Sequence, residues 1–325
     1  MAKSARQYVR PTDDDLRVRA LEIDDPHNQA GLVNHIPNGV DVVRIINTYS
    51  YSLWPADKAY CAKCEGKRHK HGFTAELDDG TLALLGSRCG EKLWGQSWQE
   101  AAGRFKEELD RAGTILGFDR IVPELRSIRE ALEGWRPAVS CVAKHQQAFI
   151  KQHSFWFYEF RAAAVRHDRR LVVHESTRDH AGEAEYERRY GDKPSREFYM
   201  SVERTVHHLE GGAFFTTEKP DNLFQLALDA IDAAIAVGSN TKLHSQMKLR
   251  EHRAKVRDAK DWLERVAIVA RALRTFYGND HMSRVVGWIH RTKSDRAVDA
   301  ALKFMKLPTD YHVLDTEPLR RLQTL

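Results

Sequence analysis

Residues 60–95 read YCAKCEGKRHKHGFTAELDDGTLALLGSRCGEKLWG, and this stretch decides how the N-terminal part of the chain folds. It holds three of the four cysteines of the chain and two close histidines, namely Cys61, Cys64, His69, His71 and Cys89. A Cys-x-x-Cys pair places two thiols on one tight turn, and the third cysteine opens a predicted helix. Thiolates and imidazoles at such spacing are the ligands of a structural zinc ion. The sequence therefore predicts that a bound metal folds this region.

A β-hairpin is predicted between the second and third cysteines. The runs GFTAEL and TLALLG flank Asp78, Asp79 and Gly80, and two short apolar runs joined by Asp-Gly are a strong hairpin signal. Upstream, VDVVRIINTYSYSLW is rich in β-branched and aromatic residues and predicts a strand that leads into the cysteines.

The fourth metal ligand is predicted to be a histidine, because Cys141 lies in a different, helical context. Residues two apart in an extended segment project from the same face, so either His69 or His71 can reach the metal. His71 is preferred because it directly abuts the hairpin, and His69 is the alternative. The predicted zinc site comprises Cys61, Cys64, His71 and Cys89.

These residues resemble the short treble-clef-like zinc fingers, in which Cys-x-x-Cys, a β-hairpin and Gly-x-x-Cys at a helix start follow one another. Here the motifs are CAKC and GSRC, and the resemblance covers about residues 58–96. It implies a zinc-organised module of a kind that recurs in nucleic-acid-associated bacterial and phage proteins. The chain departs from the usual treble clef, which takes two ligands from the helix, because Gly86 stands where the other would be.

A structural role for the zinc is favoured over a catalytic one. Three thiolates donate so much electron density that a bound water would be poorly acidified, and the His-x-Glu and Pro-Cys-x-x-Cys order of zinc deaminases is absent. The sequence also holds no Gly-rich phosphate loop after a predicted strand and no Gly-x-Ser-x-Gly elbow. His207 and His208 are adjacent, so their side chains diverge. A metal-dependent hydrolase is kept as an alternative.

Helical patterns dominate after residue 97. Pro123 predicts the first turn of one helix, and apolar pairs seven apart between Cys141 and Ala163 predict one buried stripe on another. The predicted fold class is mostly α: a helical domain with long antiparallel helices plus a small β-hairpin zinc-finger module near the N-terminus. The predicted division is an N-terminal segment at 1–39, the zinc module at 40–97, and the helical domain at 98–325, with a charged, partly irregular insertion at about 168–220.

The charge of the chain is unevenly distributed along its length. The net charge is +5, but residues 241–325 hold 18 basic and 10 acidic residues, whereas residues 181–240 hold 6 basic and 11 acidic ones. The predicted phosphate contacts are Arg68, Lys70 and Arg88 around the zinc, and Lys248, Arg250, Arg253, Lys255 and Arg257 on a basic helix. The ordinary alternative is a solvated helix face with acidic partners elsewhere, such as residues 181–240.

A heptad pattern follows the basic stretch. Its apolar positions are Val256, Ala259, Leu263, Val266, Ala270, Leu273 and Tyr277. Such a seam packs against something, within the chain or on a protein partner or second copy. A helical interaction scaffold is therefore the second functional hypothesis.

The leading hypothesis is a non-enzymatic, zinc-containing nucleic-acid-binding protein, of DNA or RNA. The first twenty residues lack the apolar core of a secretory signal, and no apolar run approaches the length of a membrane span. Four cysteines in 325 residues do not make a disulfide framework. We expect a cytoplasmic protein.

Overall fold

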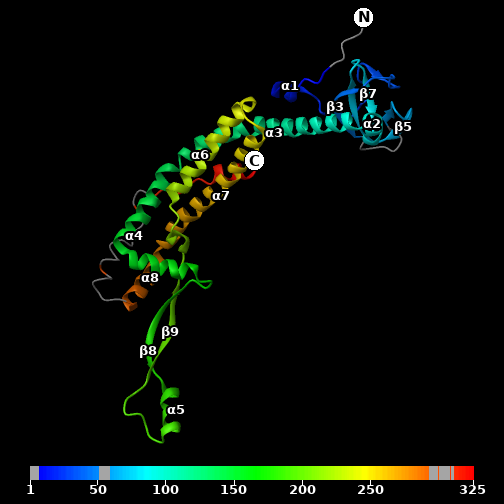
Figure 1. The fold of residues 1–325 in the computed structure, drawn as a ribbon. Coiled ribbons are helices and arrows are strands. Elements are labelled where there is room, and N and C mark those ends of the chain that lie inside the picture. The colour runs from blue at the N-terminus through cyan, green and yellow to red at the C-terminus, as the bar shows by residue number, and fades with distance from the viewer. Residues whose placement is uncertain (1–6, 51–58, 293–298, 300–307, 309–310) are drawn as a thin grey trace. The chain divides into compact units, whose positions relative to one another are not determined.

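The structure, a computed structural model, describes residues 7–50, 59–292, 299, 308 and 311–325 (Figure 1). The chain divides into two compact units. Unit 1 comprises Met1–Pro123 and Ile235–His252, and unit 2 comprises Glu124–Ala234 and Arg253–Leu325. The chain is mostly helical, which confirms the predicted predominance of helices.

A mixed sheet of five strands forms the β part of unit 1, with the order β1-β3-β6-β7-β2. Its strands are β1 (Glu22–Ile23), β2 (Leu32–Val33), β3 (Val42–Ser50), β6 (His71–Leu77) and β7 (Leu82–Leu85). The predicted hairpin is β6–β7, which pairs antiparallel with Ala75 opposite Ala83. Its turn places Gly80 at φ +88°, a left-handed conformation that suits glycine.

The sheet of unit 1 is larger than the predicted hairpin. The strands β1 and β2 come from the first 39 residues and pair in parallel with β3 and β7. Both are two residues long, too short to show an alternating pattern in the sequence. A separate two-stranded ribbon, β4 (Ala59–Cys61) and β5 (Gly66–His69), carries the Cys-x-x-Cys turn.

The core of unit 1 lies between the five-stranded sheet and three helices (Figure 1). These are α1 (Asp13–Val18), α2 (Ser87–Trp94) and the first part of α3 (Gln96–Glu133). Leu16, Ile45, Leu85 and Trp98 are among its buried residues. Gly90 of α2 lies so close to the Trp98 ring that a Cβ there would be 2.4 Å from it. Glycine therefore lets α2 pack directly on α3.

Unit 2 is built from long helices around an aromatic core. Its described helical elements are α4 (Arg136–Val165), α5 (His180–Tyr190), η1 (Gly212–Phe215), α8 (Asn279–Thr292) and α10 (Glu317–Gln323), together with parts of α3, α6 (Pro220–Ser239) and α7 (Gln246–Phe276). Phe149, Phe157, Phe160, Phe215 and Phe276 are each at most 1% exposed. Phe160 and Phe276 meet edge to face with ring centroids 5.3 Å apart.

A kink at His153 interrupts the regular backbone of α4, with φ −136° and ψ 45°. The stripe predicted on this helix nevertheless stays in the core on both sides of the kink. Val142, Phe149, Trp156 and Ala163, seven residues apart, are all buried. Phe155, the other member of the pair that follows the kink, is 47% exposed.

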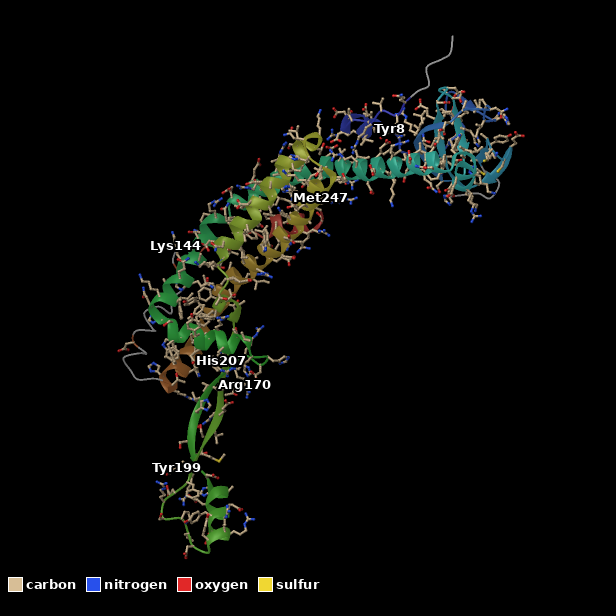
Figure 2. The ribbon with its side chains drawn as sticks, in the orientation of Figure 1. Tyr8, Lys144, Arg170, Tyr199, His207 and Met247 are labelled. Atoms are coloured by element: carbon tan, nitrogen blue, oxygen red, sulfur yellow. The ribbon has the colours of Figure 1, made fainter. Side chains whose placement is uncertain are left out.

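A two-stranded antiparallel ribbon forms most of the segment at 168–220, whose fold the sequence left open. It consists of β8 (Arg170–Arg178) and β9 (Tyr199–His208), joined by α5 (His180–Tyr190). Figure 2 labels Arg170 and His207 at the inner end of the ribbon and Tyr199 at the outer end. Leu171 and Val173 are buried in the aromatic core, whereas Tyr199 and Met200 are exposed. The ribbon is thus anchored at one end only.

None of the helices within the described ranges is both long and apolar enough to cross a membrane.

Candidate metal centre

The first two cysteines lie on the tight turn between β4 and β5. Cys61 ends β4 and is fully buried, while Cys64 is exposed within the turn. The backbone N–H of Glu65 donates to the carbonyl of Cys61 at 2.9 Å, and Glu65 has a φ of +53°. The N–H of Ala62 donates to the carbonyl of Leu84 at 3.0 Å, which ties the turn to β7. The turn is therefore held against the sheet by its backbone.

The third cysteine approaches from the first turn of α2. Gly86 is the N-cap of this helix, and the N–H of Cys89 donates to the carbonyl of Gly86 at 2.9 Å. The Sγ atoms of Cys64 and Cys89 are 3.2 Å apart, and those of all three cysteines lie within 4.8 Å of one another. Thiolates at about 2.3 Å from a tetrahedral metal are roughly 3.8 Å apart. The three cysteines can therefore hold a metal ion, as the sequence predicts.

His69 is the histidine that the structure places beside these cysteines. Its ring lies over Gly86, where a Cβ would be 3.4 Å from His69 Cδ2, and it is close enough to Cys61 to stabilise the thiolate. The Tyr49 hydroxyl is 3.2 Å from His69 Nδ1. Nε2 of His69 is buried without a well-aligned hydrogen bond to any described residue. One ring nitrogen is thus oriented by Tyr49 and the other is left for a ligand.

His71 belongs to the five-stranded sheet and not to the ribbon that carries the Cys-x-x-Cys turn. It is exposed, opens β6 and faces Ser50 of β3 in the strand register. Lys70 forms a bend between β5 and β6, which belong to different sheets. His69 and His71 would project from the same face only if the segment between them were extended. The bend at Lys70 breaks the extended segment, so the two histidines do not share a face.

The three thiols affect one another's ionisation. Burial raises the pKa of Cys61, but the nearby His69 ring and the backbone N–H groups of Cys64, Lys63 and Gly86 outweigh burial and lower it to about 6. Burial and the neighbouring thiols raise the pKa of Cys89 to about 12. In the absence of a cation, the negative charge of one thiolate therefore opposes the ionisation of the next thiol. A bound metal would relieve this repulsion. Sequence patterns contain no signal for Tyr49, because it comes from β3 and reaches His69 through pairing between distant segments.

The basic residues predicted around the zinc are only partly described. Lys70 and Arg88 are exposed, at the bend after β5 and in the first turn of α2. The side chain of Arg68 lies outside the described residues.

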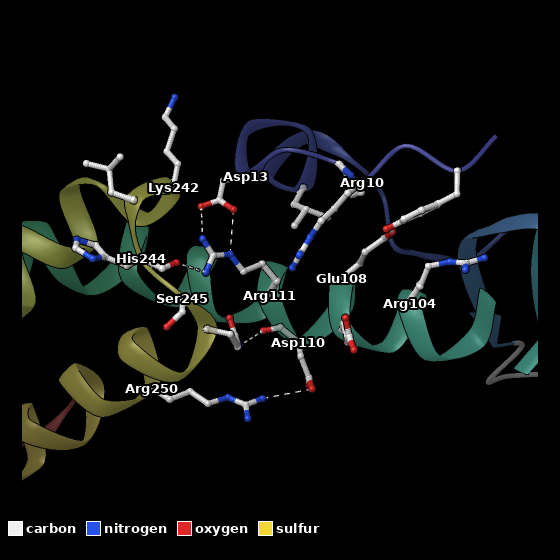
Figure 3. Close-up of a pocket in the computed structure, with 16 residues that line it drawn as sticks. Arg10, Asp13, Arg104, Glu108, Asp110, Arg111, Lys242, His244, Ser245 and Arg250 are labelled. Carbon is white, nitrogen blue, oxygen red and sulfur yellow. Dashed lines mark hydrogen bonds and ion pairs between the residues drawn. The ribbon is translucent and has the colours of Figure 1, made fainter. Parts of the chain in front are cut away.

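The predicted basic helix is the N-terminal part of α7. Lys248, Arg250, Arg253 and Arg257 are exposed, and Lys255 is half-buried. Arg250 reaches Asp110 of α3 at 3.3 Å, as Figure 3 shows, and both side chains are more than half exposed. Within the described part of the chain, no ion pair involves Lys248, Arg253 or Arg257. Acidic partners therefore neutralise this stretch only in part.

All seven residues of the heptad seam are buried within the chain itself. Ala270, Leu273 and Tyr277 belong to the aromatic core of unit 2. A protein partner or second copy at this seam stays a prediction, and it would have to displace contacts that the chain already makes.

A cavity of about 680 Å³ lies in unit 1 between the N-terminal segment, α3 and the start of α7 (Figure 3). Its walls carry both signs of charge, and several of these groups pair with one another. Arg111 donates to Asp13 at 2.8 Å and to the carbonyls of Thr241 and His244, also at 2.8 Å. The cavity is thus lined by contacts that hold the segments of unit 1 together.

Comparison with known proteins identifies no relative: no protein-family model, no curated protein and no solved structure matches this chain.

Proposed function

We propose that this chain is a non-enzymatic nucleic-acid-binding protein whose N-terminal module is stabilised by zinc. The observation that carries the proposal is the exposed cationic face at the start of α7, where Lys248, Arg253 and Arg257 have no acidic partner among the described residues. Cations along a helix suit a phosphate backbone, because each contact displaces a condensed counterion. Lys70 and Arg88, exposed beside the cysteines, add two further phosphate contacts.

Zinc is the metal that suits the cysteine cluster best. Three thiolates select soft or borderline ions, and a compact tetrahedral set with no position left for water is typical of structural zinc. His69 is the fourth ligand in this proposal, bound through Nε2. Its Nδ1–H would then donate to Tyr49, the usual orienting bond of a metal-bound imidazole. Zinc would fix the turn, the sheet and α2 as one unit.

Binding to labelled DNA and RNA, single- and double-stranded, at 50 and 200 mM salt tests the proposal. The variant Arg253→Glu/Arg257→Glu should weaken binding and lower the salt slope by about two, because two phosphate contacts are lost. The matched control is Lys106→Glu/Arg120→Glu, which changes the net charge equally at two exposed positions of α3. No binding by the wild type at 50 mM salt, or equal losses in both variants, would refute α7 as the contact surface.

A further inference from the structure

A second cluster of metal-binding side chains lies in unit 2, at the inner end of the ribbon. His207 is near the end of β9, Glu210 follows in the turn after it, and His281 lies in the first turn of α8. One ligand atom from each of the three side chains lies within 4.8 Å of the others. The two histidines are 74 positions apart in the sequence, so no spacing motif reveals the group. Figure 2 labels His207 where the ribbon meets the helices.

The two imidazoles already stand at nearly the distance that a shared metal requires. His207 Nε2 and His281 Nδ1 are 2.8 Å apart. Two ligands at about 2.1 Å from a tetrahedral ion are roughly 3.4 Å apart, so a small outward shift would admit the ion between them. Glu210 is exposed and its side chain is long, so its carboxylate can turn toward the same point.

His281 is buried, and its Nδ1 faces His207. It is 4% exposed, and its Nε2, on the other side of the ring, has no hydrogen-bond partner among the described residues. A metal would bind at Nδ1, the ring nitrogen that is 2.8 Å from His207 Nε2.

The backbone around the cluster is closely packed. Gly211 has a φ of +65°, and a Cβ on it would be 2.3 Å from the carbonyl oxygen of Ala272 in α7. The turn that carries Glu210 is therefore pinned against the end of α7. On the other side, the Trp288 indole N–H donates to the carbonyl of Val172 at 2.9 Å, which fixes α8 to the ribbon. The three side chains thus project from rigid elements.

The cluster opens onto a cavity of about 570 Å³. Asp280 and Arg284 are exposed on its wall, and Gly278 lines it without a side chain. A metal held by three protein ligands would therefore have a coordination position facing solvent. Arg284 weakens cation binding somewhat, but it favours an anionic or hydroxide ligand at that position.

We propose that His207, Glu210 and His281 form a second metal site, which binds a divalent transition-metal ion of the zinc class and leaves one position open. Two imidazoles and one carboxylate suit Zn²⁺, Co²⁺ or Fe²⁺, whereas Mg²⁺ and Ca²⁺ prefer oxygen ligands throughout. The site is independent of the cysteine cluster and of the proposed nucleic-acid binding.

Titration of the full, tag-free, metal-free chain with Co²⁺ tests this site. Cobalt bound by thiolates has a sulfur-to-metal charge-transfer band, whereas cobalt bound by nitrogen and oxygen has only the weaker visible bands. We expect one equivalent of each kind in the wild type. The variants Glu210→Gln and His281→Asn should weaken the binding of Co²⁺ to the site without sulfur ligands by about tenfold or more. They should leave the charge-transfer band of the cysteine-bound cobalt unchanged.

The matched control is His208→Asn. His208 is the neighbouring residue of β9, is exposed, and bonds through Nδ1 to the carbonyl of Asp168 rather than to the cluster. Cobalt binding should be unchanged in this variant. Glu210→Gln alters an exposed side chain, so it reports on the site even if His281→Asn fails to fold. The proposal would be overturned if the wild type bound no cobalt without sulfur ligands. It would also be overturned if Glu210→Gln bound that cobalt as tightly as the wild type.

Discussion

Arg111 is the residue on which three segments of unit 1 converge. Its guanidinium donates to both carboxylate oxygens of Asp13, at 3.0 and 2.8 Å, and to the carbonyls of Thr241 and His244. The side chains of Asp13 and Arg111 are 9% and 14% exposed. Two charges so far removed from water are stable only together, because loss of either leaves the other buried without a counterion.

Replacement of Arg111 by methionine should lower the free energy of unfolding by about 3 kcal/mol at pH 7. Burial raises the pKa of Asp13, but hydrogen bonds from Arg111 and Thr241 and the guanidinium charge outweigh it and lower the pKa below its usual value. The pair therefore stabilises the fold above about pH 4 and ceases to do so as the pH falls through the lowered pKa. Urea unfolding of Arg111→Met, wild type and the exposed control Lys106→Met across pH 3–7 measures this. The prediction is wrong if the difference in the free energy of unfolding between Arg111→Met and wild type stays the same as the pH falls from 7 to 3.

The two histidines near the cysteines should differ in their effect on metal binding. We expect His69→Asn to weaken zinc binding by about tenfold or more, because it removes the proposed fourth ligand, and His71→Asn to leave it unchanged. Competition with a chromogenic zinc chelator measures both. If His71→Asn is the weaker binder, the proposed ligand set is incorrect.

The candidate site was predictable from the sequence as far as the cysteines, and no further. Cys61, Cys64 and Cys89 follow from local spacing, since a tight turn and a helix start fix thiols without reference to the rest of the chain. The environment of His69 depends on the bend at Lys70 and on Tyr49, which comes from another strand. Distant pairing of this kind leaves no local pattern.

Among the elements, the ribbon contributes least to the core. Leu171 and Val173 at its inner end are 1% and 4% exposed, whereas Tyr199 and Met200 at its outer end are 61% and 46% exposed. Thr177 faces Met200 in the strand register. The outer end, with α5, therefore adds little burial of apolar surface to unit 2.

Joining Thr177 to Met200 by an Asn-Gly turn should change the free energy of unfolding by less than about 1 kcal/mol. By contrast, Leu171→Ala should lower it by about 2–5 kcal/mol, because it leaves a cavity in the aromatic core. Denaturant unfolding of both variants decides this. A large loss on shortening would mean that the outer end stabilises the core after all.

The long helices were predictable as helices, but their limits and kinks were not. Pro123 predicts a helix start, yet α3 continues through this residue. Leu125 and Ile128, which follow it in the helix, are fully buried. Packing of this kind offsets the roughly 3 kcal/mol that an internal proline costs. The kink at His153 in α4 likewise has no proline or glycine at that position to signal it.

At the scale of the whole molecule, the described residues form a hydrophobic core in each unit, and unit 1 has a smaller cluster around Tyr49, Ala59 and Leu84 as well. The three cysteines all lie in unit 1, next to its core. A ligand that binds only the folded form stabilises the part of the molecule that holds it. The cysteine-bound metal should therefore act on one unit and not on the other.

Removal of metal by a tight chelator should destabilise unit 1 and leave the aromatic core of unit 2 protected. At free zinc a thousand times the dissociation constant, the loss for unit 1 is about 4 kcal/mol. Hydrogen–deuterium exchange of peptides from β6–β7 and from α4, with and without chelator, measures each unit separately. Equal loss of protection in both would show that they unfold as one.

The division of unit 1 between two distant stretches of chain has a consequence for its synthesis. Ile235–His252 belongs to unit 1, and Gln246 in this stretch donates to Thr114 Oγ1 at 2.7 Å. A ribosome makes these residues only after Glu124–Ala234 of unit 2, so the N-terminal unit cannot complete its contacts first, as a contiguous domain would. Early capture of zinc by the cysteines, which are made within the first hundred residues, would hold the sheet together during that delay.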